Sequence, residues 1–165
     1  RTQACLVGRQ STRIAERAAQ AVATVKVLVD TTVWVDHFHQ SEPQLVRLLN
    51  EGCVLGHPFV LGEMALGNLQ DRSRILAWMA DLQPAVLASP AEVLELIELR
   101  GLHSQGLGYV DTHLLASVLL SPGTTLWTRD LQLFRVVKEL GLQPPIQDRF
   151  FMHDSMRNYA DSKKR

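Results

Sequence analysis

The sequence has little of what several classes of protein require. Among its 165 residues are only two cysteines, Cys5 and Cys53, too few and too far apart for a zinc site or a disulfide framework. No apolar run approaches the roughly 18 residues of a membrane span, and residues 1–24 lack the apolar segment of a secretory signal peptide. We therefore expect a protein of the reducing cytoplasm with no membrane association.

Charge of one sign is not in excess either, since 17 basic residues balance 17 acidic residues. The two signs are distributed unevenly, however. Residues 1–24 and 151–165 are basic, whereas residues 25–150 hold nine basic and fourteen acidic residues, a net charge of −5. Because Lys and Arg contacts to phosphate supply most nonspecific affinity for nucleic acid, so acidic a segment binds a polyanion poorly. An action on nucleic acid would therefore need metal ions.

What the chain does have is the composition of one ordinary globular domain. Hydrophobic residues make up 46% of it and charged residues 21%, and a chain of this length buries about two-thirds of its unfolded surface. We expect three segments. They are a basic N-terminal arm of unknown role at 1–24, a catalytic domain at 25–147 and a polar C-terminal tail at 148–165.

Strand-like and helix-like segments alternate along the chain. Short β-branched apolar runs predict strands, whereas apolar residues three or four positions apart predict helices. Such alternation predicts an α/β fold, a three-layer α/β/α sandwich around a mainly parallel sheet. The expected strands are 25–29, 53–55, 85–88 and 124–127, and the expected helices are 42–50, a helix starting at 57–58, 72–82, 91–102, 109–120 and 131–140.

Four acidic residues stand at positions where a site can form. Asp30 and Asp130 fall just past the ends of two predicted strands, which is where parallel sheets bind ligands. Asp111 lies in the first turn of a predicted helix, on the face expected to pack on the sheet. Glu63 lies three or four residues from apolar positions of its helix, so we expect it on the buried face. These acids are expected to converge at one sheet edge.

Several carboxylates at one place are costly, because like charges raise one another's pKa and burial adds to the penalty. A divalent cation removes most of that cost. Oxygen ligands without His or Cys at ligand spacing suit Mg²⁺, for which Mn²⁺ can substitute. The chemistry that follows is attack by an activated water on a phosphodiester.

Each acid also has a purely structural interpretation. Asp30 and Asp130 could be N-caps of the segments that follow them, as likely as catalysis for each alone. Asp111 at a helix start is favoured by the helix dipole without any function. Glu63, surrounded by apolar residues in sequence, is harder to explain in this way. The conjunction of the four residues carries the prediction.

Four segments of the chain form a recognisable set: VLVDTTVWVD at 27–36, the helix that contains Glu63, GYVDTHLLAS at 108–117 and LWTRD at 126–130. Together they resemble a known family, the VapC-type PIN-domain toxins. In that family an apolar strand ends in Asp followed by Thr or Ser, then a small residue and an aromatic. The resemblance covers about residues 25–143.

This resemblance implies an Mg²⁺-dependent endoribonuclease, the toxin of a toxin–antitoxin module. It further implies a substrate among structured RNAs such as tRNA or rRNA, a homodimer, and a cognate VapB-like antitoxin that silences the enzyme. Thr31 and Thr128 would assist as hydroxyl neighbours of the site. The metal-binding catalytic acids would be Asp30, Glu63, Asp111 and Asp130.

Basic, histidine and tryptophan residues of the chain also bear on its function. Arg129, beside one of the acids, is the basic residue that we expect to bind RNA phosphate. For His37 and His39, which lie at alternate positions of a helix, exposure to solvent is favoured over metal binding. Trp34, Trp78 and Trp127 are expected in the core, although an exposed one could stack on a base.

Two other functions remain open at this point. A phosphatase of the haloacid-dehalogenase type also has Asp after a buried strand, but that family has a second Asp two positions on, where this chain has Thr32. The other alternative is a non-catalytic PIN-like domain kept for binding or regulation. Metal binding without turnover would identify it.

Overall fold

The computed structural model describes residues 25–144 and 146, so the predicted arm at 1–24 and tail at 148–165 lie outside the described residues. Four strands and seven helices are present in the described part. In chain order they are β1 (Lys26–Val29), α2 (Thr31–His39), α3 (Pro43–Asn50), β2 (Val54–Gly56), α4 (Pro58–Leu66), α5 (Arg72–Ala80), β3 (Gln83–Pro84), α6 (Pro90–Arg100), α7 (Tyr109–Leu119), β4 (Thr124–Trp127) and α8 (Leu131–Glu139).

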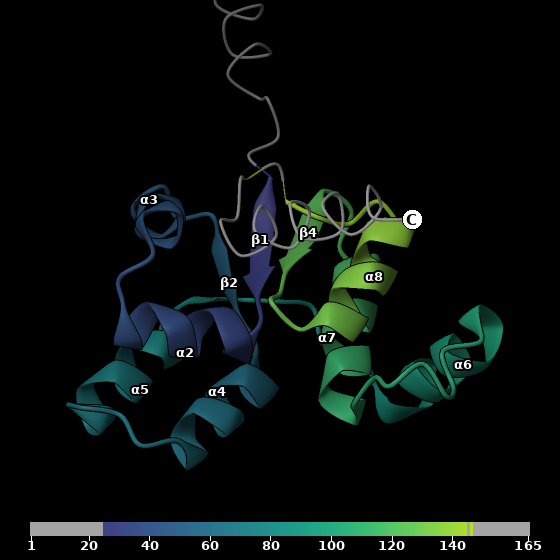
Figure 1. Ribbon diagram of the computed structural model, residues 1–165, viewed down its shortest axis with the longest axis horizontal. Coiled ribbons are helices and arrows are strands. Elements are labelled where there is room, and N and C mark those ends of the chain that lie inside the picture. Colours follow the sequence, from purple (N-terminus) through teal and green to yellow (C-terminus); the bar gives the residue numbers. More distant parts are fainter. Residues whose placement is uncertain (1–24, 145, 147–165) are drawn as a thin grey trace, which may run out of the picture.

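The four strands form one parallel sheet in the order β3-β2-β1-β4. The chain builds the sheet outward from β1 to β2 and β3, and then returns to place β4 on the other side of β1. Right-handed crossovers in opposite directions put their helices on opposite faces of a sheet. Figure 1 shows α2, α4 and α5 on one side of the strands and α7 and α8 on the other. The predicted three-layer α/β/α fold is confirmed.

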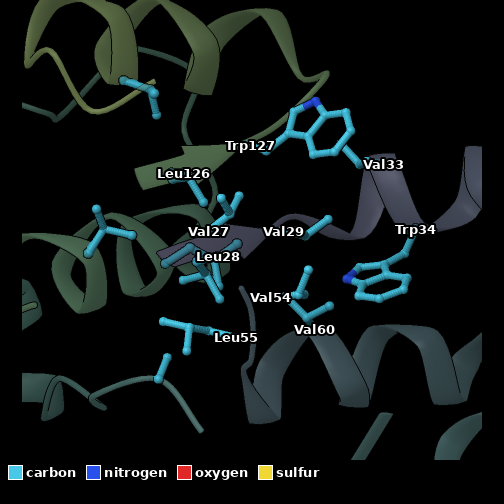
Figure 2. Close-up of a cluster of buried hydrophobic side chains, with 14 of the residues drawn as sticks. Val27, Leu28, Val29, Val33, Trp34, Val54, Leu55, Val60, Leu126 and Trp127 are labelled. Carbon is cyan, nitrogen blue, oxygen red and sulfur yellow. The ribbon is translucent and has the colours of Figure 1, made fainter. Parts of the chain in front are cut away.

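Strand β1 occupies the centre of the core. Val27, Leu28 and Val29 are at most 1% exposed, because β1 is paired on both edges and covered on both faces. Figure 2 shows these side chains alternating across the strand, with Trp127 and Trp34 on its opposite sides. Each buried Val or Leu stabilises the fold by about 1.5–3 kcal/mol. Asp30, which follows β1, is therefore attached to a well-packed part of the core.

Helix α2 begins directly after β1, and the sequence pattern alone does not predict its bounds. Its first residues, Thr-Thr-Val-Trp-Val, are β-branched or aromatic and have the propensity of a strand. Two features favour the helix instead. Asp30 caps its N-terminus, and Val33 and Trp34 are buried against the sheet.

Two expectations about the apolar residues are wrong. The strand predicted at 85–88 lies instead at Gln83–Pro84, which pair with Leu55 and Gly56 of β2, and the larger residues of 85–88 face solvent. Trp34 and Trp127 are core residues as expected, but Trp78 is 42% exposed at the edge of the Trp34 ring.

In the described part of the chain, no helix has the length and apolarity to cross a bilayer.

Candidate active site

A cavity of about 640 Å³ opens beyond the carboxyl ends of β1 and β4. The order of the strands reverses between these two strands, since β2 and β3 lie on one side of β1 and β4 on the other. Such a switch point leaves a crevice where α/β proteins bind ligands. All four acids predicted from the sequence line this cavity: Asp30, Glu63, Asp111 and Asp130.

Asp30 is the most firmly held of the four acids. Its side chain is 4% exposed. One carboxylate oxygen, Oδ1, accepts the backbone N–H of Thr31 at 2.7 Å, which caps α2. The other, Oδ2, accepts the hydroxyls of Thr32 at 2.6 Å and Thr128 at 2.8 Å. Three donors therefore fix the orientation of this carboxylate.

Asp130 holds the corresponding position after β4. Its Oδ1 accepts the backbone N–H of Leu133 at 2.8 Å and caps α8. Its own backbone N–H donates to the Thr128 hydroxyl at 3.0 Å. Because that hydroxyl in turn donates to Asp30, Thr128 links the ends of the two strands. The structure thus places Thr128 next to two of the acids, and its role in the site stays a prediction.

Asp111 enters the cavity from the first turn of α7. Its Oδ2 accepts the backbone N–H of Gly108 at 2.7 Å. Burial raises the pKa of Asp111, the Gly108 hydrogen bond opposes the rise, and the negative charges of Asp30, Asp130 and Glu63 add to it. Four elements distant in sequence thus bring their acids close enough to interact electrostatically.

Glu63 reaches the cavity, but it is exposed, and the expected burial is wrong. The buried face of α4 is formed by Val60 and Met64, each 2% exposed. Glu63 shares the outer face with Phe59 and Leu66, which are four residues before it and three after it. Because α4 is apolar nearly all round, its sequence did not show which face turns inward. Glu63 Oε2 accepts the Thr31 hydroxyl at 2.5 Å, so Thr31 contacts one of the four acids.

The donor set fits a hard divalent ion that keeps part of its water shell. Within the described residues, no three His, Cys, Asp or Glu side chains lie close enough together to hold a metal ion as one group. The carboxylates of Asp111, Asp130 and Glu63 each use one oxygen in the hydrogen bonds given above, and the described residues offer no donor to the other. Mg²⁺ characteristically binds through one or two carboxylates and several waters. One or two of these acids, together with water, could hold such an ion.

Arg129 lines the same cavity, but its guanidinium is already engaged. Nη1 contacts Asp36 Oδ2 at 2.9 Å and Nη2 contacts Glu42 Oε2 at 2.5 Å. The backbone N–H of Arg129 donates to the Thr32 hydroxyl at 3.1 Å. Sequence reasoning missed these three partners. Two of them, Thr32 and Asp36, could have been predicted from their spacing, because residues four apart lie on one face of a helix. That prediction requires α2 to be recognised as a helix.

The two histidines of α2 differ from each other. His39 is exposed, as expected, and its ring lies 2.8 Å from the Val35 carbonyl. His37 is half-buried against Trp34, and its Nδ1 accepts the backbone N–H of Glu42. Burial lowers the pKa of His37, which the nearby Glu42 partly offsets. Neither histidine lines the acidic cavity.

Comparison with known proteins gives two relatives. Both are ribonuclease VapC32, from two strains of Mycobacterium tuberculosis, and each is 40% identical to this chain over 116 residues. The aligned segment is 70% of this chain and 94% of each relative. No family model and no solved structure matches the chain.

Proposed function

Because the chain belongs to the VapC-type PIN-domain ribonucleases, we propose that it is an Mg²⁺-dependent endoribonuclease, with Mn²⁺ able to substitute. The observation that carries this proposal is the common cavity of the four acids at the β1/β4 switch point. Burial is the main cause of the raised pKa of Asp111, and repulsion by the other acids adds to it. A bound cation would relieve that repulsion. The proposed metal-binding residues are Asp30, Glu63, Asp111 and Asp130.

The chemistry supplied by a bound divalent ion would be activation of a water and stabilisation of the charge that develops on the phosphate. The residues of the chain orient the reactants. Asp30, fixed by three donors, presents its carboxylate in one direction. Thr31 restrains Glu63, which would otherwise sample several rotamers on the exposed face of α4. Arg129 is the proposed contact to an RNA phosphate.

The biological partners follow from family membership and are likewise proposals. The substrate is a structured RNA of the tRNA or rRNA class, and the enzyme is the toxin of a toxin–antitoxin pair. A VapB-like antitoxin would restrain it in the cytoplasm, and the enzyme would act as a homodimer. A cation from the antitoxin, an Arg or Lys side chain, could satisfy the same carboxylates as the metal.

Incubation of the full chain with total RNA, followed by mapping of the new ends, tests the proposed function. We expect cleavage in Mg²⁺ that leaves 5′-phosphate and 3′-hydroxyl ends, because water is the nucleophile. Excess EDTA should abolish it. Cleavage that continues undiminished in EDTA would exclude the metal-dependent mechanism, and binding of Mg²⁺ with no cleavage of any RNA would favour a non-catalytic PIN-like domain.

A further inference from the structure

Arg129 lies between two carboxylates that differ in exposure. The Arg129 side chain is 10% exposed, and the Glu42 side chain beside it is 15% exposed. The Asp36 side chain, which contacts the other terminal nitrogen, is 53% exposed. The guanidinium is therefore bound on one side by an enclosed carboxylate and on the other by one that water reaches freely.

The exposed partner is the one on the side of the acidic cavity. Asp36 and Arg129 both line the cavity, whereas Glu42 does not. A phosphate that approached Arg129 through the cavity would meet the nitrogen that Asp36 now contacts. Asp36 thus covers the part of the guanidinium that a substrate could reach.

The two carboxylates also differ in how firmly they are held. Glu42 is tied by a second bond, because its Oε1 accepts the backbone N–H of Gln44 and caps α3. Among the described residues, the Asp36 carboxylate contacts Arg129 alone. An ion pair whose carboxylate is exposed to solvent contributes little to stability. Asp36 is the partner that can leave without loosening the fold.

We propose that Asp36 occupies the place of an RNA phosphate on Arg129 and is displaced when RNA binds, while Glu42 keeps the guanidinium in position. Carboxylate and phosphate oxygens accept the same pair of guanidinium N–H donors, so one anion can replace the other. Asp36 is then a positioning residue that acts through Arg129 and lowers the affinity for RNA. The inference rests on the proposed ribonuclease function.

The exchange predicts a specific dependence on salt. In the parent protein, gaining the Arg129–phosphate contact requires losing the Arg129–Asp36 contact, so little net charge is neutralised. With Asp36 changed to Asn, the phosphate contact is gained outright. Each phosphate contact to a single strand steepens the slope of log affinity against log salt by about 0.7.

The test is equilibrium binding of a fluorescent single-stranded oligoribonucleotide to the full chain, with Ca²⁺ in place of Mg²⁺ and at several salt concentrations. We expect Asp36→Asn to bind at least about threefold more tightly at low salt and with a steeper salt slope. Arg129→Gln should bind more weakly. The double variant should match Arg129→Gln, because Asp36 acts only through Arg129. Glu139→Gln, an exposed acid on α8, is the control for general charge.

Three results would overturn the inference. They are unchanged or weaker binding by Asp36→Asn, equal tightening in the Arg129→Gln background, and an equal effect of Glu139→Gln.

Parallel samples in Mg²⁺ monitor RNA cleavage by the parent protein. If the parent cleaves RNA but Asp36→Asn shows no coupling to Arg129, only the Asp36 inference fails. If the parent neither binds nor cleaves RNA, the proposed function and this inference fail together.

Discussion

The helices that follow β1 and β4 and the helices that follow β2 and β3 are capped at their N-termini by different kinds of side chain. The helix that follows each strand has a polar N-cap. At the β2 and β3 side the caps are His57, whose Nδ1 accepts the Phe59 N–H, and Ser89, whose hydroxyl accepts the Glu92 N–H. At the β1 and β4 side the caps are Asp30 and Asp130. Neutral side chains thus suffice to cap α4 and α6.

The difference shows that capping alone does not explain the acids. Asn and Ser cap helices about as well as Asp, and at Asp30 and Asp130 a neutral cap would avoid repulsion with Asp111 and Glu63. The charge is kept at the one edge where the cavity opens. We propose that the acidic caps have two roles, in which one oxygen caps the helix and the carboxylate as a whole serves the proposed metal site.

Neutralising an acidic cap should give the largest effect. Asp30→Asn and Asp130→Asn are expected to lower the RNA cleavage rate at least ~100-fold, because an amide is a far poorer Mg²⁺ ligand than a carboxylate. Asn retains the cap, so both variants should remain folded. Single-turnover cleavage and circular dichroism measure the two properties separately. Full activity in a folded Asp30→Asn protein would remove Asp30 from the site.

The neutral cap His57 should respond to pH. Burial lowers the pKa of His57 to about 4, and the charge of His113 adds to the lowering. A histidine with a lowered folded pKa stays neutral in the fold while the unfolded chain takes up a proton. Stability from this group is therefore complete above the unfolded pKa of about 6.5 and is lost as pH falls toward 4.

His57→Asn isolates this contribution, since Asn can cap but does not titrate. The variant also loses the 3.1 Å contact between His57 Nε2 and the Ser117 hydroxyl. This loss changes the free energy of unfolding by the same amount at every pH. Urea unfolding between pH 7 and pH 4 should show a shallower fall in the free energy of unfolding than in the parent. The raised pKa of Asp111 acts in the opposite sense in both proteins and cancels. Parallel curves would show that His57 does not titrate in this window.

A smaller effect is expected at the other neutral cap. Ser89→Ala removes the acceptor for the Glu92 N–H and should lower the free energy of unfolding by about 1 kcal/mol. RNA cleavage should not change, because α6 contributes no residue to the cavity. A matched loss of activity would mean that stability, and not the acids, accounts for the effects of cap substitutions.

The smallest effect on stability is expected at Glu63. Glu63→Gln removes one of the four mutually repelling charges, so the metal-free protein should be as stable as the parent or more so. The rise in melting temperature on adding Mg²⁺ should shrink, because one ligand is weakened. Thermal melts in EDTA and in millimolar Mg²⁺ measure both. A large loss of stability in EDTA would mean that Glu63 serves a structural bond and not a shared metal site.

The sequence predicted the site best where local pattern and topology coincide. Asp30 directly follows one β-branched run and Asp130 lies three residues past another, and parallel pairing brings the ends of both strands to one edge of the sheet. The strand Thr124–Trp127 agrees with the structure at both ends. Strand β3 was misplaced, because a strand of two residues has no period to detect.

What the sequence could not supply is the set of contacts between distant elements. The exposure of Glu63 depends on which face of an apolar helix meets the sheet, and nothing in the pattern of α4 decides it. The engagement of Arg129 by Asp36 and Glu42 joins positions 93 and 87 residues apart. Such pairings follow from tertiary packing, which overrides local propensity, as in α2.

The most direct test of the two roles of the acidic caps is Mn²⁺ binding to the folded protein. Electron paramagnetic resonance measures it for the parent and for the variants Asp130→Asn and Ser89→Ala. Both substitutions alter an N-cap, but only the first removes a carboxylate from the cavity. The account predicts that the parent and Ser89→Ala bind Mn²⁺ equally and that Asp130→Asn binds it at least ~10-fold more weakly. Equal Mn²⁺ binding by all three proteins, or none by the parent, would contradict it.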